Sequence, residues 1–170
     1  MIFKTTFTAA IFGIALFSTA AFSKDDSRVF LQKATQAELG EINQAQLALK
    51  MSANPEILKF TRILLEDQRR LQKQLKILAD KKRVELPDEI TPKQEAVSYR
   101  LSKLTVKDKT FDRKYLKQVL KERENFQRLF KTQAKSGTDA DIKDLASKTL
   151  PQIISHLKAA ELLSAKQEKR

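Results

Sequence analysis

A few polar and charged residues interrupt the apolar stripes of this sequence, and their side chains are the ones that could do chemistry. In one stripe, apolar residues recur at alternating steps of four and three, and Gln68 lies in its middle. Comparable stripes contain Glu41, either Glu122 or Arg123, and the single histidine, His156. Because this spacing keeps residues on the core-facing side of a helix, we expect Glu41, Gln68, His156 and one of Glu122 and Arg123 to form a buried polar layer.

Distances along the chain place these residues at similar heights in a helical bundle. Glu41 and Gln68 lie twelve and fifteen residues from a turn near Ala53, and His156 lies nineteen residues after Gly137. At about 1.5 Å of rise per residue, the side chains fall within about two helical turns of one another. The polar layer is therefore expected near the middle of the bundle.

Two kinds of chemistry fit such a layer. A di-metal carboxylate site in a bundle uses Glu-x-x-His motifs, and this sequence has none. His156, Glu41 and Glu122 could still hold one divalent cation, although Arg123 would repel it. We favour an ion-pair network without metal, in which Arg123 neutralises Glu41 or Glu122. Gln68 would supply the remaining hydrogen bonds, and the metal site is the alternative.

Composition excludes several other chemistries. The sequence has 170 residues, no cysteine and only 3 glycines, so disulfides, thiolate metal sites, cysteine nucleophiles and glycine-rich phosphate loops are absent. Ser155 adjoins His156, and adjacent residues on a helix do not face each other. We therefore predict no catalytic residue, no cofactor and no enzymatic activity.

Start and stop signals divide the chain into helices that would position the polar layer. Asn54 before Pro55 and the capping box beginning at Thr91 open two of them. Thr138 or Asp139 caps another, after a Gly137 expected to adopt a left-handed conformation. The expected helices span residues 26–51, 55–83, 92–104, 110–135 and 139–164.

Short turns join the first two long helices and the last two, which predicts two antiparallel hairpins. The short helix 92–104 and its flanking loops would connect the hairpins. The predicted fold is therefore all-α, a ferritin-like four-helix bundle with a short crossover helix. This single domain spans residues 24–165 and is followed by a charged tail, 166–170.

The first 23 residues have the pattern of a secretory signal peptide. Lys4 precedes an apolar run over residues 7–17, and Ala21 and Ser23 provide small side chains at the −3 and −1 positions. We predict cleavage after Ser23 and a periplasmic or secreted protein. The apolar run is shorter than the ~20 residues that span a bilayer, and no later segment is apolar enough to cross a membrane.

Several strings resemble the domain-of-unknown-function family 4142. They are FLQKA (30–34), LEDQ (65–68), LP (86–87), FDRKYL (111–116) and KTLP (148–151) followed by HL (156–157). The resemblance covers residues 29–163 and implies a secreted, ferritin-like bundle of a family often described as outer-membrane proteins. The family often has Asp-His pairs where this chain has Asp67-Gln68 and Glu122-Arg123; only His156 remains. The resemblance implies no activity.

The formal net charge of +12 is concentrated on two of the expected helices. Segments 55–83 and 111–137 each carry +5, and their outer positions include a set of cations. These are Arg69, Arg70, Lys73, Lys76, Lys114, Lys117, Lys121 and Arg128. A basic face of this kind favours anionic partners. Nucleic acid is disfavoured because the aromatic residues mostly occupy apolar stripes and leave no exposed stacking surface.

The sequence thus predicts an exported, outer-membrane-associated protein with a structural or binding role in the cell envelope. Its basic face would bind anionic lipid headgroups, lipopolysaccharide or acidic envelope proteins. The alternative is a degenerate ferritin-like metal-binding protein. A third hypothesis, a small-molecule carrier with a pocket between helices, has no specific residue in its support.

Overall fold

The structure is a computed structural model that describes residues 19–105 and 110–168, with side chains from residue 26 onward. These residues form five α-helices and no strand, which confirms the all-α prediction. The helices are α1 (Thr19–Met51), α2 (Pro55–Lys82), α3 (Pro92–Ser102), α4 (Thr110–Ser136) and α5 (Ala140–Glu168). Most of the predicted leader, residues 1–18, lies outside the described residues. Because α1 begins at Thr19, it continues across the predicted cleavage point after Ser23.

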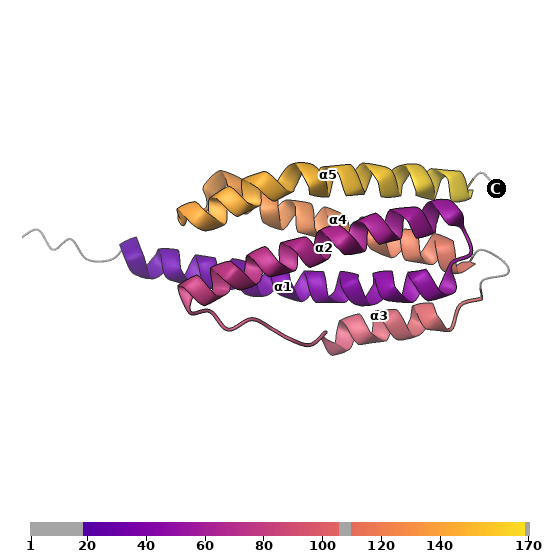
Figure 1. Cartoon of the computed structure of the whole chain (residues 1–170), viewed down its shortest axis with the longest axis horizontal. Helices are drawn as coiled ribbons and strands as arrows, with labels where there is room; N and C mark the ends of the chain where they lie inside the picture. The colour runs from indigo at the N-terminus through magenta and orange to yellow at the C-terminus, as the bar shows by residue number, and fades with distance from the viewer. Residues whose placement is uncertain (1–18, 106–109, 169–170) are drawn as a thin grey trace, which may run out of the picture.

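The four long helices pack side by side, as Figure 1 shows. α1 contacts α2 and α4, while α5 contacts α4 and α2. α2 and α4 therefore occupy diagonal corners. The shorter α3 lies against α1 and, less extensively, α4, in the long connection between the two hairpins. Within the described residues, no helix is long and apolar enough to cross a membrane.

The helix caps follow the sequence signals closely. The Asn54 side chain accepts hydrogen bonds from two backbone N–H groups in the first turn of α2. Thr91 and Gln94 form a complete capping box at the start of α3. Asp139, not Thr138, caps α5 by accepting from two backbone N–H groups at 3.1 and 3.2 Å. These contacts satisfy amide groups that a helix leaves unpaired at its N-terminus.

The prediction for Gly137 is wrong. No described glycine has a positive φ, and the left-handed helix end is Arg83 after α2, with φ 56° and ψ 46°. Gly137 instead follows the last turn of α4, where its N–H donates to the Gln133 carbonyl at 2.8 Å. A Cβ atom on Gly137 would lie 2.5 Å from that carbonyl oxygen. Position 137 therefore lacks a side chain because the Gln133 carbonyl lies too close for a Cβ atom, and not because the backbone needs a positive φ.

Two apolar clusters fill the interior, one toward each end of the bundle. The first includes Phe30, Leu75 and Phe130, and the second includes Ile57 and Leu116. The predicted stripe of α5 is buried at every position: Ile142, Ala146, Thr149, Ile153, His156, Ala160 and Leu163. Polar residues from α1, α2, α4 and α5 occupy sequence positions between the two clusters on each helix.

Candidate functional site

The centre of the polar layer is an ion pair between α1 and α4. Arg123 is 1% exposed, and its Nε donates to Glu41 Oε1 at 2.9 Å while Nη2 pairs with Glu41 Oε2. Gln68 on α2 donates from Nε2 to that same Oε2. The guanidinium also lies 4.7 Å from the centroid of the Phe126 ring, a cation–π contact. Glu41 is therefore bound from two other helices at once.

A second carboxyl, Glu38, lies one turn before Glu41 and is completely buried. No side chain donates a hydrogen bond to either of its oxygens within the described chain. Burial raises the pKa of Glu38 to about 8, although the charge of Arg123 opposes this increase. Glu38 is thus mostly protonated at neutral pH. The single buried guanidinium then faces one charged carboxylate rather than two, because neutralising Glu38 avoids the cost of an unpaired buried charge.

The hydrogen bond of His156 goes to Asp67 rather than to the Arg123–Glu41 pair. Its Nε2 lies 2.8 Å from Oδ2 of Asp67 on α2, whose other oxygen pairs with Arg70. Burial, followed by the positive charge of Arg123, lowers the pKa of His156 to about 4. The imidazole is therefore neutral at neutral pH, and its Nε2–H donates to Asp67. This bond ties α5 to α2.

Glu122 belongs to a third group on the flank of α4. It is half-buried, and its Oε1 accepts from Gln44 Nε2 at 2.8 Å and from Gln118 Nε2 at 2.7 Å. Burial raises the pKa of Glu122, while these two amides act in the opposite direction. Of the two adjacent candidates on this helix, Arg123 is the one that faces the interior.

The predicted layer thus divides into separate contacts. Glu41, Gln68 and Arg123 meet, whereas Glu122 and His156 each bind other side chains. The alternative metal ligands, His156, Glu41 and Glu122, do not converge. No group of three His, Cys, Asp or Glu residues in the described part of the chain is placed to hold a metal ion. The space beside Glu41, Glu122 and Arg123 has no volume that a water molecule could occupy.

Sequence reasoning missed Glu38 and Asp67. The spacing of α1 also fits a stripe through Ala34, Ala37 and Glu41, but the buried row runs through Ala34, Glu38 and Glu41 at steps of four and three. That spacing was available in the sequence. Asp67 immediately precedes Gln68, and both are buried because this side of α2 faces two neighbouring helices.

All eight predicted surface cations are exposed: Arg69, Arg70, Lys73, Lys76, Lys114, Lys117, Lys121 and Arg128. They form two surfaces rather than one, because α2 and α4 occupy diagonal corners. On α2, Arg70 pairs with Glu66 and Asp67. On α4, none of the ion pairs within the described residues involves Lys114, Lys117 or Lys121.

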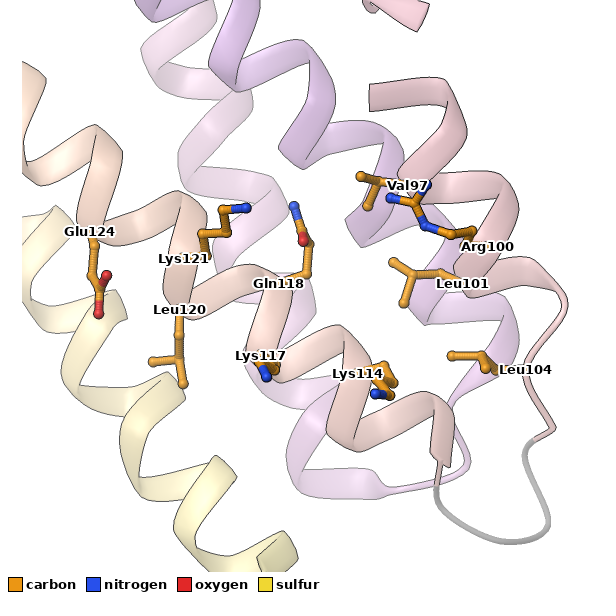
Figure 2. Close-up of a pocket in the computed structure, with 10 residues that line it drawn as sticks. All are labelled: Val97, Arg100, Leu101, Leu104, Lys114, Lys117, Gln118, Leu120, Lys121 and Glu124. Atoms are coloured by element: carbon orange, nitrogen blue, oxygen red, sulfur yellow. The ribbon is translucent and has the colours of Figure 1, made fainter. Parts of the chain in front are cut away.

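A groove separates the α4 lysines from α3. It has a volume of about 610 Å³. Figure 2 shows Lys114, Lys117 and Lys121 on the α4 side, with Val97 and Leu101 on the α3 side. This groove is large enough to accept a small ligand, and it lies outside the buried polar layer.

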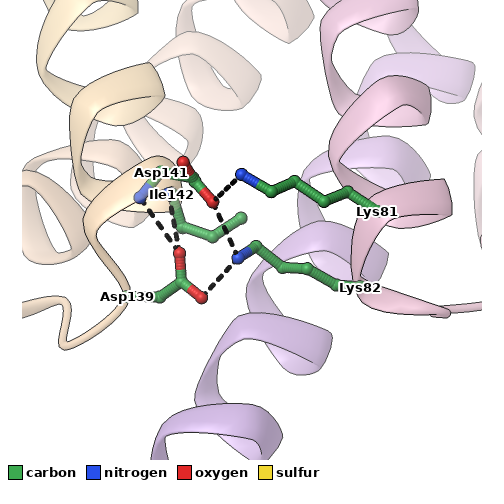
Figure 3. A network of polar contacts seen from close by, with 5 residues as sticks. All are labelled: Lys81, Lys82, Asp139, Asp141 and Ile142. Atoms are coloured by element: carbon green, nitrogen blue, oxygen red, sulfur yellow. Dashed lines mark hydrogen bonds and ion pairs between the residues drawn. The ribbon is translucent and has the colours of Figure 1, made fainter.

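Another polar cluster joins the end of α2 to the start of α5 (Figure 3). Lys82 Nζ bridges Asp139 and Asp141, and Lys81 donates to Asp141 at 2.8 Å. The hydrogen bonds and charges of the two lysines lower the pKa of Asp141. This cluster fixes one end of the bundle, since Asp139 is also the cap of α5.

The fold and the polar layer together define a helical-bundle protein with a buried Arg123–Glu41 ion pair in its interior. The chain belongs to the family DUF4142, a domain of unknown function, which matches residues 15–163. This match confirms the family inferred from the sequence strings. No curated protein matches the chain.

Among solved structures, the chain is similar to a DUF305 fragment from Deinococcus radiodurans. The TM-score is 0.73 at 15% sequence identity, and the match covers 83% of this chain and 96% of that one. At this identity, the likeness concerns the fold alone.

Proposed function

We propose that this protein is exported to the cell envelope and binds anionic partners there, without catalysing a reaction. In this proposal residues 1–23 are a leader cleaved after Ser23, and the domain that remains is a ferritin-like four-helix bundle crossed by α3. Its partners are anionic lipid headgroups, lipopolysaccharide or acidic envelope proteins.

The row of exposed lysines on α4 carries this proposal. Lys114, Lys117 and Lys121 follow one another at steps of three and four, so they lie along one side of the helix. Each cation near an anionic membrane surface contributes about 1 kcal/mol of attraction. Three such residues together would strengthen binding by roughly a hundredfold. Arg69, Lys73 and Lys76 provide a second exposed cationic surface on α2.

The state of the buried polar groups supports a non-catalytic role. Arg123, Glu41 and Gln68 bind one another, and the space beside them admits no water. His156 is buried and donates to Asp67. A general acid or base needs access to a substrate proton, and these groups are enclosed by the bundle.

Vesicle co-sedimentation tests the proposal, with the chain lacking residues 1–23. We expect binding to phosphatidylglycerol vesicles and not to phosphatidylcholine vesicles. Binding should weaken between about 0.01 M and about 1 M salt, because the screening length falls from roughly 30 Å to roughly 3 Å. Equal binding to both vesicle types, or binding insensitive to salt, would contradict the proposal.

Two charge-reversal variants then locate the binding surface. One carries Lys114→Glu and Lys121→Glu on α4, and the other carries Lys73→Glu and Lys76→Glu on α2. The two variants have the same net charge, so a larger loss in the first assigns binding to α4. Unchanged binding by both variants would contradict an electrostatic mechanism.

Export is tested separately by fractionating cells and measuring the mass of the protein from the envelope. The expected mature protein begins at Lys24. Detection of the uncleaved chain in the cytoplasm alone would contradict export.

A further inference from the structure

The groove between α3 and α4 has two chemically different walls. On the α3 side it is lined by the half-buried Val97, the buried Leu101, the half-buried Leu104 just after the helix, and one cation, Arg100. The α4 wall presents Lys114 and Lys117 among its cations, as Figure 2 shows. A ligand lying between the helices would therefore contact an apolar surface on one side and positive charge on the other.

α3 is held mainly by α1, and its contact with α4 is the less extensive of the two. Gln94 Nε2 donates to the Gln36 carbonyl at 2.7 Å, and Ser98 Oγ donates to Asn43 Oδ1 at 2.5 Å. The helices approach closely at Gly40, where a Cβ atom would lie 2.2 Å from Gln94 Nε2. These contacts hold α3 against α1, and Leu101 packs in the apolar cluster that includes Leu116 of α4. The groove is the space that remains between α3 and α4.

The charge around the groove is strongly biased toward one sign. Its lining includes the cations Arg100, Lys114, Lys117 and Lys121, and one acid, Glu124. Figure 2 shows Glu124 near the far end of the α4 wall, away from α3. Seven residues separate Lys114 from Lys121, which corresponds to about 10 Å along the helix. A negatively charged headgroup placed anywhere along this row has a lysine within reach.

We infer that the groove binds an amphiphile with one acyl chain and a phosphate headgroup, such as an anionic lysophospholipid. The chain lies against the half-buried Val97 and Leu104, and the phosphate lies beside Lys117 and its neighbours. A volume of about 610 Å³ is in the range of ~300–1,000 Å³ typical of small-molecule sites. This inference rests on the proposed binding of anionic partners at α4, and it adds an acyl chain that binds the apolar side chains of the groove.

Isothermal titration calorimetry with ligands below their micelle concentration tests the inference. Lysophosphatidylglycerol and lysophosphatidylcholine with identical chains both carry a phosphate, but only the first has a net negative charge. We expect lysophosphatidylglycerol to bind in a one-to-one complex and lysophosphatidylcholine to bind at least about tenfold more weakly. Inorganic phosphate, which has no chain, should give no measurable binding.

Matched variants test whether the ligand binds in the groove. Leu104→Asp adds an acid to the apolar wall, and Ile77→Asp makes the same kind of change at an exposed position on α2. Lys117→Glu reverses a groove charge, and Lys73→Glu reverses one on α2. We expect a loss of about tenfold or more for each groove variant and less than about twofold for each α2 control. Circular dichroism verifies folding, and Lys117→Glu serves if Leu104→Asp does not fold.

The outcomes separate this inference from the proposed function. Vesicle binding without lysophosphatidylglycerol binding would overturn the groove inference alone. Binding of inorganic phosphate as tight as that of lysophosphatidylglycerol would overturn it too, because the apolar wall would contribute nothing. Equal losses in the groove variants and the α2 controls would place the ligand elsewhere. Groove-dependent lipid binding without vesicle binding would support the inference and contradict surface attachment.

Discussion

Replacing Glu38 by glutamine removes one buried titrating group while keeping the shape of the side chain. Glu38 is fully buried near Arg123, and its pKa is raised from 4.5 to about 8. The folded protein therefore binds this proton more tightly than the unfolded chain does. The protonated Glu38 carboxyl makes its full contribution to the free energy of unfolding below about pH 4.5, and this contribution is lost as the pH rises through 8.

The size of the effect follows from the change in pKa. A displacement from 4.5 to about 8 corresponds to about 5 kcal/mol between the two ends of the titration. His156 acts in the opposite direction, because its pKa falls from 6.5 to about 4 and its contribution is lost as pH falls through that range. Burial also raises the pKa of Glu122, so Glu38 is isolated by comparing the wild-type protein with Glu38→Gln between pH 6.5 and pH 8.

Urea unfolding followed by circular dichroism measures this interval directly. We expect the wild-type protein to lose about 1–2 kcal/mol of unfolding free energy between pH 6.5 and pH 8 through Glu38. Glu38→Gln should lose almost none of it and should be the more stable protein at pH 8. An identical loss in the two proteins would show that Glu38 is ionised when folded and would refute this account of the layer.

Substitutions at three further contacts are tested by urea unfolding. Arg123→Met should cost about 3–5 kcal/mol, because it leaves the Glu41 carboxylate buried without its cation, and Glu41→Gln in the same protein should recover part of this loss. Tyr115→Phe should cost about 1–3 kcal/mol by leaving the buried Thr61 hydroxyl, 3.1 Å away, without a partner; adding Thr61→Val should recover most of it. Asp139→Asn retains the cap of α5 but breaks the ion pair in Figure 3, so it should cost at most about 1 kcal/mol and less at high salt. Asp139→Ala should cost about 1 kcal/mol more. If Glu41→Gln or Thr61→Val recovered no stability, the Arg123–Glu41 or Tyr115–Thr61 contact would be contradicted. Equal costs for the two Asp139 variants would contradict the cap.

The sequence was sufficient for the helices and for most of their buried faces. Asn54, Thr91 and Asp139 cap helices because a polar side chain at these positions bonds to nearby backbone amides, which is a local interaction. The stripe of α5 is continuous and apolar apart from Thr149 and His156, so its buried face was unambiguous.

The polar contacts required information that a single helix does not contain. Glu122 and Arg123 are adjacent and differ by about 100° around the helix axis, so periodicity left both open. Packing decides between them, because only Arg123 faces Glu41 on α1. The α1 stripe was ambiguous for another reason: its small residues allowed a row through Ala37 as well as the buried row through Glu38.

The position of the polar layer between two apolar clusters has a consequence for how the helices align. If α4 slid by one turn, about 5.4 Å, Arg123 would leave Glu41 and enter an apolar cluster. Each separated charge would then be buried without a partner, at a cost of several kcal/mol. Apolar side chains alone would discriminate less sharply against such a slip, because one buried aliphatic contact can replace another. Glu41, Gln68 and Arg123 therefore select the register of α1, α2 and α4, whatever net stability the ion pair itself contributes.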